Sequence, residues 1–101
     1  MATTIIEGDF EWDADKAASN LAKHDVSFEE AATALADEMA LFDRDDRHEE
    51  EDRYKAVGMS VRLRVLLVVV VERGDRERII SARRATEREE QNYYAKAGEE
   101  G

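Results

Sequence analysis

The sequence of 101 residues contains no cysteine and no proline. Without cysteine there are no disulfides, no thiolate zinc sites and no cysteine nucleophile, so packing alone must hold the fold. The longest apolar run, Val65–Val71, is much shorter than the roughly 20 residues of a membrane-spanning helix, and the N-terminus lacks the basic-then-apolar pattern of a secretory signal. We therefore expect a cytoplasmic protein with no membrane partner. Its length predicts a single domain over residues 1–101, with flexible ends at 1–8 and 98–101.

Charge is abundant but unevenly distributed. The formal net charge is -10, yet residues 53–88 hold ten of the 15 Lys and Arg residues and only four acids. Nine of those ten bases are Arg, whose planar guanidinium suits bidentate contacts with phosphate. This pattern favours phosphate chemistry, although a solvated surface of mixed charge explains it equally well. The excess of acids over only four lysines is also typical of proteins that stay hydrated in concentrated salt.

Capping signals predict three helices. Asp13 can cap a first helix that runs to about His24, and Asp25 then occupies a position that favours a left-handed residue. Ser27 and Glu30 form a capping box, which predicts a second helix over about 28–37. A second box at residues 86 and 89 predicts a last helix to about 97.

Between the second and third helices the sequence predicts a meander of strands. A weak strand is expected at 40–42, a moderate one at 54–59, and strong ones at 65–73 and 76–84, with a short first strand at 5–12 as an optional further element. The element order (β)ααββββα indicates an α+β fold, with helices packed on one face of a small antiparallel sheet.

The turns between the strands predict the register. Gly74-Asp75 fits a two-residue hairpin turn, which pairs Val71 with Arg78, Val69 with Ile80 and, further on, residue 67 with 82. A four-residue turn at 60–63 pairs residue 59 with 64 and residue 55 with 68. One face is then almost wholly apolar and should lie under the helices: Tyr54, Ala56, Val65, Leu67, Val69, Val71, Ile80 and Ala82.

The other face predicted by this register mixes cations with apolar residues. It carries Arg53, Lys55, Arg64, Ser81 and Arg83 around Val57, Leu66, Val68, Val70 and Ile79. Such a patch can bind a phosphodiester through its cations and hold bases on its apolar strip. A one-residue slip would bring Arg78 and Arg84 there instead. The alternative is structural: these arginines form ordinary ion pairs with Glu72, Glu77, Glu87 or Glu89.

Three collinear blocks of the sequence resemble the BrnT toxins of type II toxin-antitoxin pairs, over about residues 10–93. The first block is Phe10-Glu11-Trp12-Asp13 with Lys16, Asn20, Lys23-His24, Val26, Phe28 and Ala31. The second is Glu51-Asp52-Arg53-Tyr54 leading to Gly58, and the third is Arg78–Ala85 with Glu89 and Tyr93. The resemblance implies a RelE-like fold and a metal-independent endoribonuclease. It also implies that a small ribbon-helix-helix antitoxin inhibits the toxin. The complex of the two would bind DNA only through the antitoxin.

These expectations give a specific site. Metal-free RNA cleavage uses the adjacent 2'-hydroxyl as nucleophile, so the protein must position the strand, stabilise phosphorane charge and move two protons. No cofactor and no metal are expected, because His24 and His48 lie far apart and no clustered ligand spacing is present. The candidate catalytic residues are Arg83, Arg53, Arg64 and His48, and the candidate RNA-binding residues are Lys55, Ser81, Arg78 and Lys23. The alternative function is a noncatalytic module that binds the antitoxin but no longer cleaves RNA.

Overall fold

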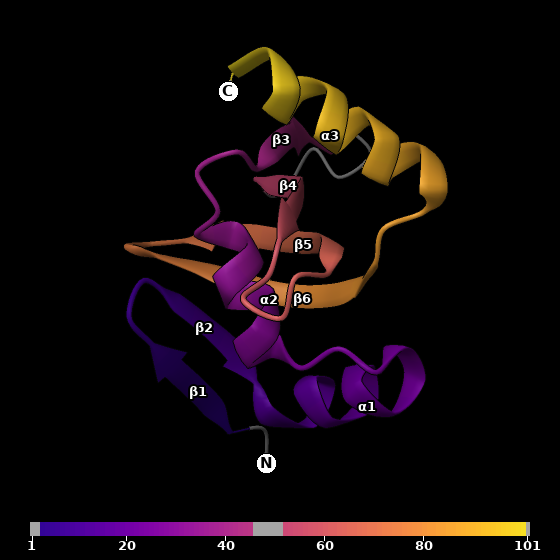
Figure 1. Ribbon diagram of the computed structural model, residues 1–101. Helices are drawn as coiled ribbons and strands as arrows, with labels where there is room; N and C mark the ends of the chain where they lie inside the picture. Colours follow the sequence, from indigo (N-terminus) through magenta and orange to yellow (C-terminus); the bar gives the residue numbers. More distant parts are fainter. Residues whose placement is uncertain (1–2, 46–51, 101) are drawn as a thin grey trace.

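The computed structural model describes residues 3–45 and 52–100 and contains three helices and one six-stranded sheet (Figure 1). The sheet order is β1-β2-β6-β5-β4-β3, and all neighbouring strands are antiparallel except β2 and β6. The elements are β1 (Thr4–Glu7), β2 (Phe10–Asp13), α1 (Ala14–His24), α2 (Phe28–Leu35), β3 (Leu41–Arg44), β4 (Arg53–Met59), β5 (Val65–Arg73), β6 (Arg76–Arg84) and α3 (Glu87–Glu100). The predicted α+β class is confirmed. No helix in the described parts of the chain is long and apolar enough to span a membrane.

The N-terminal segment is more ordered than the sequence suggested. Residues Thr4–Glu7, which we expected to be loose, form β1 and pair with β2 across a turn in which Gly8 has a φ of 60°. β2 continues the sheet beyond β6 as its one parallel neighbour. The reason is burial, because Trp12 on β2 is only 1% exposed and packs edge-to-face on Phe28 of α2, with 6.2 Å between ring centroids.

The predicted helix caps are present. Asp13 accepts a hydrogen bond from the Lys16 backbone N–H at 2.9 Å, and α1 ends at Asp25, which has a φ of 57°. The Ser27 hydroxyl oxygen caps α2 in the same way. At α3 the box is reciprocal: Thr86 N–H donates to the side chain of Glu89, and Glu89 N–H donates to the Thr86 hydroxyl oxygen. The last helix continues to residue 100, past its expected end at 97.

α1 and α2 cover one face of the sheet, and the hydrophobic core lies mainly between α2 and β4, β5 and β6, with Ala17 of α1 half-buried against it. The sheet contributes six fully or almost fully buried residues to this core: Ala56, Leu66, Val68, Val70, Ile79 and Ala82. α3 lies apart from these helices, along the β3–β4 end of the sheet (Figure 1).

The predicted register between β4 and β5 is wrong by one residue. Met59 pairs with Val65, not with Arg64, because the connection uses residues 60–64 and is closed by a hydrogen bond from Ser60 N–H to the Arg64 carbonyl. Leu63 takes the left-handed conformation that this longer turn requires, with a φ of 63°. As a result, Leu66, Val68 and Val70 face the helices and not the opposite side.

The register between β5 and β6 changes at a β-bulge. Val71 pairs with Arg78 as predicted and Val70 pairs with Ile79, but Val69 pairs with Ser81, so Ile80 is an extra residue without a partner on β5. The predicted pairs of Val69 with Ile80 and of residue 67 with 82 are therefore wrong. The bulge lets Ile79 and residue 82, three positions apart, both reach the core, where both are fully buried.

Asn20 fastens α1 to the sheet at this bulge. Its amide nitrogen donates to the carbonyls of Val26 at 3.0 Å and Ala82 at 2.8 Å, and its side-chain oxygen accepts from the Ala82 N–H at 3.1 Å. Replacing Asn20 by Ala leaves these buried backbone groups without partners, so we expect the free energy of unfolding to fall by about 3 kcal/mol. Urea denaturation measures this, with exposed Ser19→Ala as control. A loss in Asn20→Ala no larger than in the control would contradict the assignment.

Candidate functional site

The sheet face opposite α1 and α2, called here the second face, carries most of the predicted site residues. Three cross-strand rows of β4, β5 and β6 define it: Arg53–Val71–Arg78, Lys55–Val69–Ser81 and Val57–Leu67–Arg83. Cations and a hydroxyl thus surround a strip of Val and Leu. Because of the bulge, Arg78 and Arg83 lie on the same face although they are five positions apart, whereas the register predicted from the sequence had offered them as alternatives.

α3 closes the β3–β4 end of the second face. Glu89 and Asn92 of this helix, together with strand residues that include Asp43, Lys55 and Leu67, line a cavity of about 280 Å³. Lys55 reaches this cavity from the middle row and has no ion-pair partner among residues 3–45 and 52–100. It is therefore a cation whose charge is available to a ligand.

Arg83 is held by a bidentate ion pair. Its two terminal nitrogens donate to the two carboxylate oxygens of Glu89 at 2.9 and 3.1 Å, and one of them also donates to the Arg84 carbonyl at 3.0 Å. The hydrogen bond from Arg83 lowers the pKa of Glu89. The pair joins the end of β6 to α3, yet the Arg83 side chain remains 36% exposed. The guanidinium is thus fixed in position and still open to solvent.

Arg78 is fixed in a similar way at the other end of β6. Its guanidinium donates to the Glu11 carboxylate at 2.5 Å, across the parallel β2–β6 pair. Both side chains are largely buried, at 18% and 15% exposure. Arg53 occupies the same row on β4 and is half-buried. Glu89 was among the partners that the structural alternative offered, whereas Glu11 was not.

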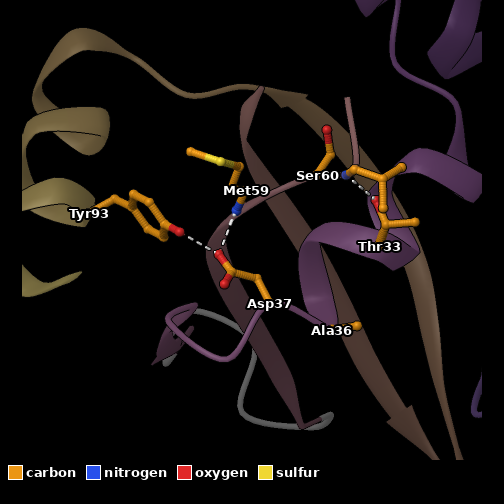
Figure 2. Close-up of a pocket in the computed structure, with 7 residues that line it drawn as sticks. Thr33, Ala36, Asp37, Met59, Ser60 and Tyr93 are labelled. Atoms are coloured by element: carbon orange, nitrogen blue, oxygen red, sulfur yellow. Dashed lines mark hydrogen bonds between the residues drawn. The ribbon is translucent and has the colours of Figure 1, made fainter. Parts of the chain in front are cut away.

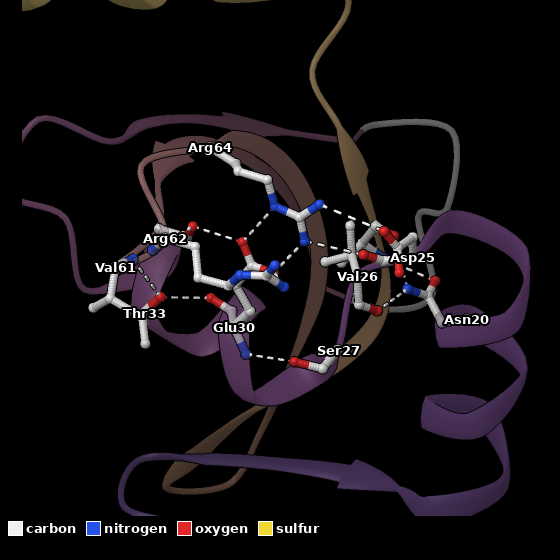
Figure 3. Close-up of polar contacts among 11 residues, drawn as sticks. Asn20, Asp25, Val26, Ser27, Glu30, Thr33, Val61, Arg62 and Arg64 are labelled. Carbon is white, nitrogen blue, oxygen red and sulfur yellow. Dashed lines mark hydrogen bonds and ion pairs between the residues drawn. The ribbon is translucent and has the colours of Figure 1, made fainter.

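Arg64 does not lie on the second face, and its predicted position there is wrong. Because it belongs to the β4–β5 connection, its side chain reaches the opposite side of the sheet and binds α2 (Figure 3). It forms a bidentate pair with Glu30, whose Oε2 accepts from Nε at 2.9 Å, and it donates to the Asp25 carbonyl at 3.0 Å. The Ser60 hydroxyl donates to the same carboxylate at 2.6 Å. This network is a buried strut between α2 and the loop.

Of two further predicted residues, one is not described by the structure and the other lies away from the second face. His48 falls within 46–51, outside the described residues. Lys23 lies on α1 and lines a groove between α1 and β6, where it shares the lining with Ser81. The second face therefore unites Arg53, Lys55, Arg78, Ser81 and Arg83, and not Arg64 or Lys23.

Sequence reasoning missed Asp37, which ties α3 to the rest of the fold (Figure 2). Its carboxylate accepts from the Met59 N–H at 2.8 Å and from the Tyr93 hydroxyl at 2.5 Å, beside a cavity of about 450 Å³. Burial and the contact with Asp37 raise the pKa of Tyr93 to about 12. For Asp37 itself, burial acts to raise the pKa, but the donors from Met59, Tyr93 and Met39 outweigh it and lower the pKa. No sequence signal could have found this contact, because its two side chains are 56 positions apart.

The described part of the chain holds no cluster of three or more His, Asp or Glu side chains able to bind one metal ion. The donors on the second face are mainly guanidinium, ammonium and hydroxyl groups, which suit an anion and not a cation.

Comparison with known proteins shows the family of this chain and a solved structure with a similar fold. The family model described as "Ribonuclease toxin, BrnT, of type II toxin-antitoxin system" matches residues 12–89. The fold is similar to the 1.1 Å crystal structure of the Brucella abortus ribonuclease toxin, BrnT, with a TM-score of 0.60 and 26% sequence identity over 75% of this chain and 94% of that chain. A search of curated proteins finds no match.

The Glu30–Arg64 network generates a prediction about acid stability. The hydrogen bond from Arg64 lowers the pKa of Glu30 below its ordinary value of 4.5. The ion pair therefore contributes fully to stability above pH 4.5, and this contribution is lost as the pH falls through the lower pKa of Glu30 in the folded state. We expect Glu30→Gln to lower the free energy of unfolding by about 3 kcal/mol at pH 7, because it leaves Arg64 buried without its anion, and by less at pH 3.

Urea denaturation at pH 7, 5 and 3 tests this, with exposed Glu29→Gln as the control for loss of one charge. A difference between wild type and Glu30→Gln that stays constant over this range would show that the pair does not carry the predicted acid sensitivity.

Proposed function

Because the chain belongs to the BrnT family of ribonuclease toxins of type II toxin-antitoxin systems, we propose that it cleaves RNA on the second face, without a metal ion. The observation that carries this proposal is the gathering of Arg53, Lys55, Arg78, Ser81 and Arg83 around an apolar strip on one rigid sheet. Cations of this kind bind the phosphodiester backbone, and the half-buried side chains of Val57 and Val69 offer apolar surface to bases, whereas Leu67 and Val71 are buried.

The proposed reaction is an internal transesterification. The RNA 2'-oxygen loses its proton to a general base and attacks the adjacent phosphorus, and the bond from phosphorus to the 5'-oxygen breaks while a general acid gives that oxygen a proton. The products are a 2',3'-cyclic phosphate and a 5'-hydroxyl. Guanidinium groups stabilise the negative charge that builds on the phosphorane oxygens. His48 is proposed for proton transfer, since an imidazole titrates near neutral pH.

Arg83 is the residue proposed to stabilise the phosphorane. It is partly exposed, and its ion pair with Glu89 holds the guanidinium in one orientation at the end of β6. A preorganised cation costs little reorganisation when charge develops in the transition state. Lys55 and Ser81 in the adjacent row are proposed to hold the strand, with Arg53 and Arg78 at the far end of the face.

The second candidate function is a noncatalytic module that binds the antitoxin alone. One observation favours it: Arg78 and Arg83 already have carboxylate partners, and these partners cancel much of their charge. The two functions differ in what the loss of Glu89 should do. If Arg83 acts on RNA, loss of the Glu89 carboxylate should affect cleavage less than loss of Arg83, because the guanidinium is still present. If Arg83 serves only to hold α3, loss of either partner should have the same effect.

Cleavage of single-stranded RNA in excess EDTA tests the function directly. We expect the wild-type protein to cut RNA and leave 2',3'-cyclic phosphate ends. Arg83→Ala should lower the rate by about two decades or more, a few kcal/mol of transition-state stabilisation. Glu89→Gln should lower the rate much less than Arg83→Ala, because the guanidinium remains and the Gln carbonyl can still accept one of its hydrogen bonds.

Circular dichroism must show that both variants are folded. Intact RNA after long incubation of folded wild-type protein at several salt concentrations would favour the noncatalytic module. Equal losses in Arg83→Ala and Glu89→Gln would show that the pair serves only to hold α3.

A type II toxin has a protein antitoxin as partner. We propose that this partner is a small ribbon-helix-helix protein whose disordered arm folds over the second face and blocks RNA. Val69 and Arg83 on this face are only partly buried, so an arm that contacts them would compete with RNA for the same surface. Coexpression with the product of the adjacent small reading frame should give a stable complex, and the amide NMR signals of Lys55, Val69 and Arg83 should shift on binding. A stable complex that leaves these signals unchanged would show that the partner binds elsewhere.

A further inference from the structure

The groove between α1 and β6 is basic, and we propose that it binds a second phosphate of the RNA strand, next to the second face. This inference rests on the proposed function, since it assigns an additional subsite to the same substrate. The groove has a volume of about 260 Å³ and is lined by Lys16, Ser19, Lys23 and His24 of α1 and by Ser81 of β6, among others. It therefore combines two ammonium groups with an imidazole and two hydroxyls, all of which can donate to phosphate oxygens.

The charge of this groove is unusual for this protein. The chain has a formal net charge of -10, and four other cavities of the described residues are each lined by at least one carboxylate, such as Asp37, Asp43 or Glu77. No carboxylate of the described residues lines the α1–β6 groove. Lys16 and Lys23 also have no ion-pair partner among residues 3–45 and 52–100. Their charges are thus free for an external anion, unlike those of Arg64, Arg78 and Arg83.

The groove is also rigidly built. Lys16 and Lys23 are seven residues apart and so lie on one face of α1, with Asn20 between them. The buried hydrogen bonds of Asn20 to Ala82 fix that face against β6. β2 pairs with β6 only at residues 77 and 78, so no strand of the described residues flanks the following part of β6 on this side, which leaves space beside α1.

Ser81 connects the groove with the second face. It lines the groove, and it also ends the middle row that runs from Lys55 through Val69. β4 and β6 are two strands apart, which corresponds to about 10 Å. An RNA strand that crosses the second face at Lys55 therefore reaches Ser81 and then the two lysines of α1. Phosphate contacts of this kind fix the position of the strand without reading its bases.

Binding of an RNA that cannot be cleaved tests the inference separately from catalysis. The probe is a fluorescent 12-nucleotide 2'-O-methyl RNA, which lacks the nucleophilic hydroxyl, and its affinity is measured by anisotropy over a range of NaCl concentrations. We expect Lys23→Gln to weaken binding several-fold and Lys16→Gln/Lys23→Gln about tenfold. The double variant should also reduce the slope of log affinity against log salt by about 0.7, the value for one phosphate contact on a single strand.

Lys96→Gln is the matched control, because Lys96 is an exposed helix lysine that pairs with Glu99 on α3, away from the groove. It removes the same charge and should leave affinity and salt slope unchanged. Equal effects of Lys23→Gln and Lys96→Gln would overturn the groove as a subsite while leaving the function intact if the wild-type protein still cleaves RNA. Folded wild-type protein that neither binds nor cleaves RNA would overturn both proposals. Loss of antitoxin affinity without loss of RNA affinity in the double variant would identify the groove as a protein contact and overturn the inference.

Discussion

The extra residue at position 80 determines which side chains of β6 reach the core and which reach the second face. In a regular strand, Arg78 and Arg83 would point to opposite faces, and so would Ile79 and Ala82. With Ile80 unpaired, the two apolar residues both pack under the helices, and the two arginines both lie on the second face with Ser81. One local irregularity therefore completes the core and gathers the cations. Bulges are frequent at functional sites for this reason, since they redirect a side chain without changing the rest of the sheet.

Three arginine–carboxylate pairs then join separate elements of the fold, and two of them join elements that are distant in sequence. Glu30–Arg64 joins α2 to the β4–β5 connection, while Arg78 reaches β2 and Arg83 reaches α3. Pairs of this kind recover little net energy, because burying the charges costs nearly as much as their attraction returns. Their main effect is positional: the Glu30–Arg64 and Arg83–Glu89 pairs are bidentate, and the Arg78–Glu11 pair is a single hydrogen bond between two largely buried side chains. Arg78 and Arg83 on the second face are therefore cations held in place, while Lys16, Lys23 and Lys55 have no ion-pair partner among the described residues and can hold a strand.

Local signals in the sequence predicted the elements well, whereas long-range geometry was predicted poorly. The caps at Asp13, Ser27 and Thr86 are determined by residues three positions away, and the structure confirms all three. The bounds of β5 and β6 are also as expected, because apolar runs flank a clear hairpin turn. The strand register depends on the length of the β4–β5 connection and on the bulge in β6. Neither can be predicted from a run of Val and Ile residues. Because the β4–β5 connection has one residue more than predicted, Arg64 pairs with Glu30 and does not lie on the second face.

The site was partly accessible to sequence reasoning for the same reason. Four of the predicted residues lie together on one face as expected: Arg53, Lys55, Ser81 and Arg83. The β5 residues between them are Leu67, Val69 and Val71, whereas the predicted register placed Leu66, Val68 and Val70 there. The contacts of Asp37 with Tyr93 and of Glu11 with Arg78 join positions more than 50 residues apart, which no local pattern encodes.

The central claim is that RNA binds the second face, and arginine side-chain NMR tests it most directly. In protein labelled with ¹⁵N-arginine, the Nε–Hε signals of Arg64, Arg78 and Arg83 report on opposite faces of the same sheet. On addition of the 2'-O-methyl RNA, the account predicts that the signals of Arg78 and Arg83 shift together while that of Arg64 stays unchanged. A shift of Arg64 with Arg78 and Arg83 unaffected would contradict it.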